Sequence, residues 1–283
     1  MCDKLHTSWN ESIQRHGSRA DRPERSVTTT LSAQESELGA PDTIVDVSGD
    51  DHGLWAAPPG IPETLKRRSV AHAPVRFKIR LANSEGRRSA ASYLIHKMYS
   101  WRGYSASGPQ PAPNRVTLMA SDAEKALATI SVGFDSDEGL VVEDLYADKV
   151  KELRARGGRL CEFTKLAVDR NEQSKEVLAM MFHIAYMYAR RIHGCTDLVI
   201  EVNPRHVRFY ERMLGFREFG PARLCPRVGA PAVLLWLDLE YAQEQIAIYG
   251  GQRETAGQVR SLYPFFFSAD EEAGIVGRLR AIG

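Results

Sequence analysis

The stretch that decides the fold is Leu198-Val-Ile-Glu-Val-Asn-Pro-Arg-His-Val-Arg-Phe-Tyr-Glu-Arg-Met-Leu-Gly-Phe216. It opens with an apolar strand at 198–202, and Pro204 then begins a short helix because its ring presets the helical backbone angle. Gly215 ends this helix, and further strands are expected at about 216–224 and 231–239. The stretch therefore predicts one end of a mixed α/β domain.

The same alternation of strands and helices extends back to residue 75. Ser84 is placed to cap a helix that runs to about Tyr99, and Ser174 to cap another that runs to about Ile192. The other expected elements are strands at 75–81, 116–120, 126–134 and 161–168 and a helix at 148–156. We predict one α/β domain over residues 74–240.

Two flanking segments differ in composition from this domain. Residues 1–73 are polar, with seven acids and no Lys or Arg between 31 and 63, so we expect a disordered acidic tail. The alternative is a pseudo-substrate that screens a basic docking face. Residues 241–283 predict a helical extension whose Tyr263–Phe267 cluster docks on the domain, the alternatives being a flap over an apolar ligand or a weak membrane contact.

Composition excludes several classes of protein. The 283 residues include 37 Lys and Arg against 36 Asp and Glu, so no overall charge attracts nucleic acid or a membrane surface. Four cysteines without metal-ligand spacing suggest reduced thiols, and no stretch approaches the roughly 18 apolar residues of a membrane helix. We expect a cytoplasmic protein with no integral membrane segment, no metal and no tightly bound cofactor.

The helix after Pro204 has a distinctive spacing of aromatic, acidic and glycine residues. The spacing of Asn203, Phe209, Tyr210, Glu211, Gly215 and Phe216 resembles the closing motif of the GCN5-related N-acyltransferase fold. That resemblance implies a mixed, mostly antiparallel central sheet flanked by helices, and it implies that Tyr210 points at the sulfur of a thioester. We expect Phe209 and Leu214 to be core residues and Tyr210 to face elsewhere.

The turn before the long helix departs from that family. Ordinary members bind the coenzyme A pyrophosphate there with glycine amides, whereas 169–176 contains no glycine. Arg170 or Lys175 can still pair with one phosphate, which is what a phosphopantetheine arm carries. This difference favours an acyl carrier protein thioester as the donor over coenzyme A.

The strand Cys161-Glu-Phe-Thr-Lys-Leu-Ala-Val-Asp169 points in the same direction. It is similar to a strand of acyl-homoserine lactone synthases, and with Pro204-Arg-His it resembles long-chain N-acyl amino acid synthases of the N-acyl tyrosine type over about residues 75–240. The segment 101–107 lacks the acidic cluster that lactone synthases use around S-adenosylmethionine. The resemblance therefore implies that a free amino acid accepts the acyl chain.

Thioester aminolysis assigns roles to residues of this strand and helix. Glu162 is the candidate base, unless it only forms a structural ion pair with Lys165. Backbone N–H groups near Leu166 and Val168 can hold the thioester oxygen if the strand splays from its neighbour. Tyr210 would protonate the sulfur, and Thr164 and His206 are secondary candidates.

Binding roles follow from charge and apolarity. Met180 and Met181 either line an acyl tunnel or belong to the core. Lys165, Arg170, Lys175, Arg205 and Arg208 are candidates for contact with an acidic acyl carrier protein, and Arg102, Arg87 or Arg88 for the acceptor carboxylate. The alternative functions are a lactone synthase, a coenzyme A dependent N-acyltransferase, and a non-catalytic protein that binds acyl groups or acyl carrier protein.

Overall fold

The computed structural model describes residues 42–47 and 77–282, except 106, 110, 124 and 170–174. Its centre is an eight-stranded sheet of order β1-β2-β3-β4-β5-β6-β8-β7, antiparallel at every pairing except β5 with β6. The strands are β1 (Thr43–Val47), β2 (Phe77–Leu81), β3 (Arg115–Asp122), β4 (Lys125–Phe134), β5 (Leu160–Val168), β6 (Asp197–Val202), β7 (Arg217–Cys225) and β8 (Ala230–Asp238). The mixed, mostly antiparallel sheet expected from the sequence is confirmed.

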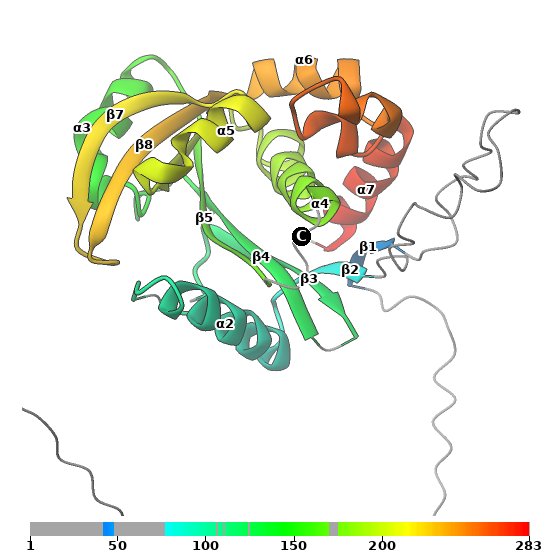
Figure 1. The fold of residues 1–283 in the computed structure, drawn as a ribbon, viewed down its shortest axis with the longest axis horizontal. Coiled ribbons are helices and arrows are strands. Elements are labelled where there is room, and N and C mark those ends of the chain that lie inside the picture. Colours follow the sequence, from blue (N-terminus) through cyan, green and yellow to red (C-terminus); the bar gives the residue numbers. More distant parts are fainter. Residues whose placement is uncertain are drawn as a thin grey trace, which may run out of the picture. The chain divides into compact units, whose positions relative to one another are not determined.

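Helices cover both faces of this sheet, and Figure 1 shows α2 (Glu85–Ser100) on one side of β3–β5 with α4 (Lys175–Tyr186) on the other. Ser84 caps α2 by accepting a hydrogen bond from the Arg87 N–H, as the sequence predicts. The other α-helices of the described residues are α3 (Glu143–Ala155), α5 (Val207–Leu214), α6 (Leu239–Tyr249) and α7 (Ala269–Ile282). Apolar residues of α3 pack against Leu160 and Val199, so α3 shares the face of the sheet that includes these two side chains.

Strand β1 corrects the expectation of a wholly disordered tail. Thr43–Val47 pairs antiparallel with β2, and Ile44, Val45 and Val47 are buried. The β-branched residues of this short run fit a sheet edge, where added pairing offsets the entropy of ordering. The other residues of the expected 1–73 tail, apart from Asp42, lie outside the described residues.

The C-terminal extension docks on the domain, as expected. Phe266 and Phe267 are buried in the main core, together with Ile275 and Leu279 of α7. His183 of α4 accepts the Phe267 N–H at Nδ1 (3.0 Å), and its Nε2 lies 3.1 Å from Glu272 of α7. Burial lowers the pKa of His183, so a neutral ring donates from Nε2 to Glu272 and ties α7 to the core.

The two parallel strands part in the middle of the sheet. β5 pairs with β6 only through Leu160–Glu162, opposite Asp197–Val199, although both strands continue. Beyond this point β5 also bulges, because its register with β4 shifts between Thr129 and Ser131, and Lys165 takes a positive φ of 52°. The splay leaves a wedge between β5 and β6, and the bulge turns the backbone of β5 beside it.

Candidate active site

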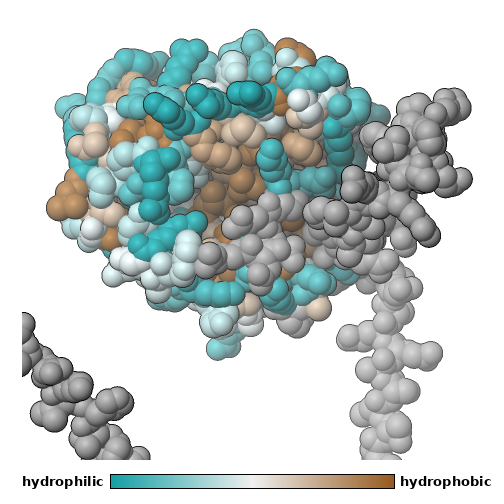
Figure 2. All heavy atoms as spheres, in the orientation of Figure 1, coloured by the Kyte–Doolittle hydropathy of each residue, from teal (hydrophilic) through white to brown (hydrophobic). Residues whose placement is uncertain are grey.

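A cavity of about 1170 Å³ occupies this wedge and is called the central cavity below. Glu162 and Glu201 line it from the α3 side of the sheet, and Phe163, Phe182 and Tyr210 from the α4 side. Side chains from both faces reach one cavity because β5 and β6 no longer pair there. Figure 2 shows apolar side chains at the centre of the visible face, framed by hydrophilic ones.

Glu162 lies at the floor of the central cavity and is 1% exposed. Its Oε1 accepts from Arg115 Nη2 (2.9 Å), and its Oε2 accepts from the Val142 N–H (3.0 Å). Burial raises the pKa of Glu162, while these donors act in the opposite direction. The ion pair partner is therefore Arg115 of β3, and the alternative of a Glu162–Lys165 pair is wrong.

Gly133 makes this ion pair possible. It stands between the two strands, since Arg115 is opposite Gly133 in β3·β4 and Glu162 is opposite Gly133 in β4·β5. A Cβ at Gly133 would lie 2.8 Å from Oε1 and 2.9 Å from Cγ of Glu162. The absence of a side chain at Gly133 thus lets Glu162 lie across β4 and meet Arg115.

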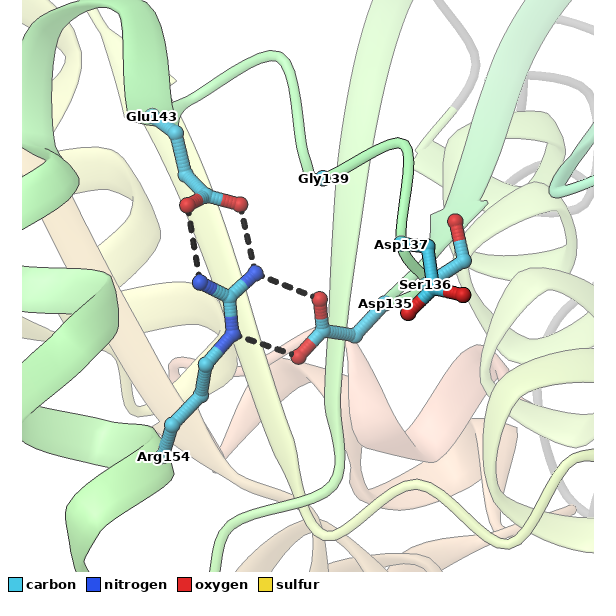
Figure 3. A pocket seen from close by; sticks show the side chains of 6 residues that line it. All are labelled: Asp135, Ser136, Asp137, Gly139, Glu143 and Arg154. Carbon is cyan, nitrogen blue, oxygen red and sulfur yellow. Dashed lines mark hydrogen bonds and ion pairs between the residues drawn. The ribbon is translucent and has the colours of Figure 1, made fainter.

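The loop that carries Val142 is held by a separate ion-pair cluster. Figure 3 shows Arg154 of α3 between Glu143 and Asp135, with Nη1 and Nη2 on Glu143 (2.8 and 2.5 Å) and Nε and Nη2 on Asp135 (2.8 and 2.6 Å). Each carboxylate receives two N–H groups of one planar guanidinium, which fixes its orientation. The cluster joins the end of β4 to the start of α3, and so keeps the Val142 N–H aimed at Glu162.

The bulged strand also borders the central cavity with its backbone. The Asp169 N–H bonds to the Leu127 carbonyl of β4 (2.8 Å), and N–H groups alternate in direction along a strand. The Val168 N–H therefore points away from β4, toward the splayed β6 side; Val168 and Leu166, which lies at the bulge, both line the central cavity. Thr164 also lines it, while Lys165 reaches the Gly108 carbonyl with Nζ (2.6 Å). Lys165 thus lies inside the cavity and not on an outer docking surface.

Tyr210 of α5 borders the central cavity on the α4 side. Its ring meets Phe182 and Phe216 edge to face, with centroids 6.2 and 5.7 Å apart. Burial raises the pKa of Tyr210, so its hydroxyl stays protonated. Phe209 does not belong to the core as expected: it is 38% exposed and lines the cavity, because α5 turns this face to the wedge.

The residues of α4 that line the central cavity are not those expected from the sequence. Met180 and Met181 are 1% and 0% exposed and lie in the main core, away from the cavity lining. Leu178 and Phe182 line the cavity instead. The helix is apolar on nearly all sides, so composition alone did not show which side faces the wedge.

The basic candidates are dispersed. Arg102 and Lys175 line the central cavity, whereas Arg205 and Arg208 lie exposed outside it and Arg170 lies outside the described residues. Arg87 bonds to Asp42 and Asn83, and Arg88 to the Asn83 carbonyl, so neither is a cavity residue. His206 lines the cavity, and burial lowers its pKa.

The charged cavity residues that sequence reasoning missed include Arg115 and Glu201. Glu201 lies on β6 with Oε2 bonded to Arg227, and burial raises its pKa to about 7. A signal was present, since each is a charged residue within an otherwise half-buried strand, where an unpaired charge is costly.

The described part of the chain offers no candidate cluster of metal ligands and no candidate membrane-spanning helix. No group of three His, Cys, Asp or Glu residues there has the geometry to hold a metal ion. None of its helices combines the length and apolarity needed to cross a membrane. The described cysteines, Cys161, Cys195 and Cys225, are buried and free.

A splayed parallel pair beside a bulged strand, within a mostly antiparallel sheet, defines a GCN5-related N-acyltransferase fold, and the chain is an N-acyltransferase. Its residues 90–238 match the profile of the family N-acyl amino acid synthase FeeM, so the chain belongs to this family. It resembles the structure of FeeM, an N-acyl amino acid synthase from uncultured soil microbes, at 26% identity with a TM-score of 0.54, over 60% of this chain and 94% of that one.

Two other solved structures give weaker matches. An acyl-CoA N-acyltransferase from Pseudomonas aeruginosa matches at 13% identity and a TM-score of 0.40, over 56% of this chain and 97% of that one. A CoA-dependent acyl-homoserine lactone synthase, BjaI, matches at 9% identity and a TM-score of 0.42, over 57% and 80%. No curated protein sequence matches the chain.

Proposed function

We propose that the protein transfers a medium or long fatty acyl chain from the phosphopantetheine thioester of an acyl carrier protein to the amine of a free amino acid. The observation that carries this proposal is the central cavity, which joins an apolar side at Leu178 and Phe182 to a charged side at Glu162 and Arg115. An acyl chain fits the first and a zwitterionic acceptor the second, with the β5 amides between them.

The choice of donor rests on the turn before α4 and on charge. The sequence 169–176 has no glycine to admit a pyrophosphate, and Lys175 at the cavity rim offers one cation for one phosphate. Arg205, in the turn before α5, and Arg208, within α5, are exposed and would attract an acidic carrier protein. Use of an acyl carrier protein as the donor would place the reaction in the cytoplasm. The product, an N-acyl amino acid, would be amphiphilic and therefore suited to lipid signalling.

The choice of acceptor rests on Arg102. Its Nη1 donates to the Met98 carbonyl (3.3 Å), and no ion pair with any described carboxylate involves it. Arg102 lines the cavity and can therefore bind the carboxylate of an amino acid. Both oxygens of Glu162 already accept hydrogen bonds, which favours a role in holding Arg115 and the start of α3 over the role of base.

The chemical step then uses the two sides of the cavity together. The acceptor ammonium loses one proton to a cavity carboxylate, and the neutral nitrogen attacks the thioester carbon. The developing oxyanion is stabilised by the N–H groups of Leu166 and Val168, a contribution of about 2.7–4 kcal/mol per donor in comparable sites. The C–S bond breaks, Tyr210 protonates the thiolate, and the second amine proton returns to Tyr210 as the amide forms.

Mass spectrometry of lipid extracts from cells that overproduce the protein tests this proposal, because product mass reports both the acyl chain and the acceptor. N-acyl amino acids are expected, and their loss in the Glu162→Gln, Tyr210→Phe double variant would support the site. Acyl-homoserine lactones would favour the lactone synthase alternative. Absence of any product together with tight binding of acyl carrier protein would favour the non-catalytic alternative.

A further inference from the structure

Glu201 occupies a special position on β6. Val199 is the last β6 residue that pairs with β5, and Glu201 is the next residue whose side chain points to the same face of the sheet. It is thus the first residue of β6 on the charged side of the wedge. Its neighbours along the strand, Ile200 and Val202, are apolar and buried, so a carboxylate here is costly to retain without a function.

The two oxygens of Glu201 have different surroundings. Oε2 bonds to Arg227, whose Nη1 also donates to the Val141 carbonyl (2.6 Å) and to Asp144 (2.9 Å). Oε1 is buried and has no hydrogen-bond partner within the part of the chain that the structure describes. Since Glu201 lines the central cavity, this oxygen is a buried acceptor that a ligand donor can satisfy.

The groups that face Glu201 set its charge. Arg227 from the β7–β8 turn favours the carboxylate, while Glu162 of β5 and Asp144 of α3 oppose it. Tyr146 of α3 also lies near enough for Glu201 to raise the pKa of its phenol. With burial as the largest cause, the pKa of Glu201 rises to about 7, which suits a group that exchanges protons near neutral pH.

Glu201 is also connected to the arginine proposed for the acceptor carboxylate. Asn203 follows two residues later, and its Nδ2 donates to the Tyr104 hydroxyl (3.1 Å). Tyr104 stands two residues after Arg102, and both line the central cavity. This contact tethers the loop after α2, which carries Arg102, to the end of β6, which carries Glu201, and both residues line the same cavity.

We propose that Oε1 of Glu201 receives the ammonium group of the acceptor and takes one of its protons before attack. The inference rests on the proposed function and deepens it, because it selects for acceptors with a free amine beside a carboxylate. Transfer of the proton leaves neutral Glu201 and a neutral amine, and the acid returns its proton to solvent after the amide forms. No group outside the cavity is required.

The pH dependence of kcat/KM for the amino acid acceptor, measured at saturating dodecanoyl acyl carrier protein, tests this inference. The acceptor is whichever standard amino acid gives the most product. In the wild-type protein, activity should fall as pH drops through about 7, because Glu201 becomes protonated, and fall again above the pKa of the acceptor ammonium. In Glu201→Gln, activity should instead rise with pH as neutral amine accumulates, and should be reduced at least about tenfold at pH 7.

Equilibrium binding gives a second readout that does not depend on turnover. The wild-type protein should bind the amino acid at least about tenfold more tightly than the corresponding 2-hydroxy acid at pH 7, since only the former has an ammonium group. Glu201→Gln should lose most of this preference, and Glu201→Asp should retain part of it. Glu218→Gln, which removes an exposed carboxylate from β7, is the matched control and should behave as the wild type.

The outcomes separate the two proposals. A wild-type protein that acylates no amino acid overturns the proposed function, and this inference with it. A protein that does so while Glu201→Gln keeps the wild-type pH profile and ammonium preference overturns the inference alone. If Glu201→Gln does not fold, the wild-type profile and the hydroxy acid comparison decide, and equal binding of the two compounds rejects the inference.

Discussion

Replacing Gly133 with alanine tests whether the Arg115–Glu162 ion pair supports catalysis. The new Cβ would lie 2.8 Å from Oε1, 2.9 Å from Cγ and 3.3 Å from Cδ of Glu162, distances at which atoms must move. Glu162 has little freedom to do so, because Arg115 and the Val142 N–H each bond to one of its oxygens. The alanine therefore has to displace Glu162 from at least one partner or separate β4 from β5.

The magnitude follows from these two consequences. Overpacking of this kind costs about 1–3 kcal/mol, which lowers the Tm of a domain of this size by roughly 2–12 °C. Loss of a charge-assisted hydrogen bond is worth about 1.5–3 kcal/mol, so kcat/KM should fall by at least about tenfold if the ion pair matters to the reaction. Both effects come from one methyl group on β4.

The assay combines thermal unfolding, followed by circular dichroism, with initial rates of amide formation from an acyl carrier protein thioester. Gly86→Ala is the matched control, since a Cβ there meets nothing within 4 Å and alanine suits helix α2 better than glycine. Its Tm and rates should equal or slightly exceed the wild-type values. A Gly133→Ala variant with wild-type Tm and kcat/KM would refute the reasoning.

Two further predictions concern the opposite side of the central cavity. Tyr210→Phe keeps the ring contacts but removes the proton donor, so kcat should fall about tenfold. Activity should not be abolished, because a thiol of pKa ~8.5 is an adequate leaving group without a proton donor. Rapid-quench measurement of the acyl transfer step checks this prediction, and an unchanged rate would remove Tyr210 from the mechanism. Leu178→Trp should fill part of the apolar side of the cavity and shift the preference toward shorter acyl chains when thioesters of different length compete. Met181→Leu, in the core, is the control and should leave the chain-length preference unchanged. An unchanged chain-length preference in Leu178→Trp would place the acyl chain elsewhere.

The elements closest to the site were predictable because local chemistry specifies them. Ser84 caps α2, Gly215 takes a φ of 82° to end α5, and the strand around Glu162 has the expected place beside a splay. These features depend on short-range capping, turn and periodicity signals, which a sequence carries directly.

What escaped prediction depends on contacts between distant parts of the chain. The partner of Glu162 is 47 residues away on β3 and reaches it only across Gly133, so local spacing suggested Lys165 instead. In α4, residues on one side of the helix line the cavity and residues on the other sides belong to the core. Because almost all of them are apolar, the sequence does not show which side faces the cavity. Glu201 gained its importance from the splay of its strand, a property of pairing with β5.

The most direct test of the donor assignment is a comparison of kcat/KM for dodecanoyl acyl carrier protein and dodecanoyl coenzyme A, with the same amino acid acceptor and N-acyl amino acid formation as the readout. The glycine-free turn at 169–176 and the exposed Arg205 and Arg208 predict a preference for the carrier protein of at least about a hundredfold at low salt, declining as salt rises. Equal or higher kcat/KM for the coenzyme A thioester, independent of salt, would contradict the account.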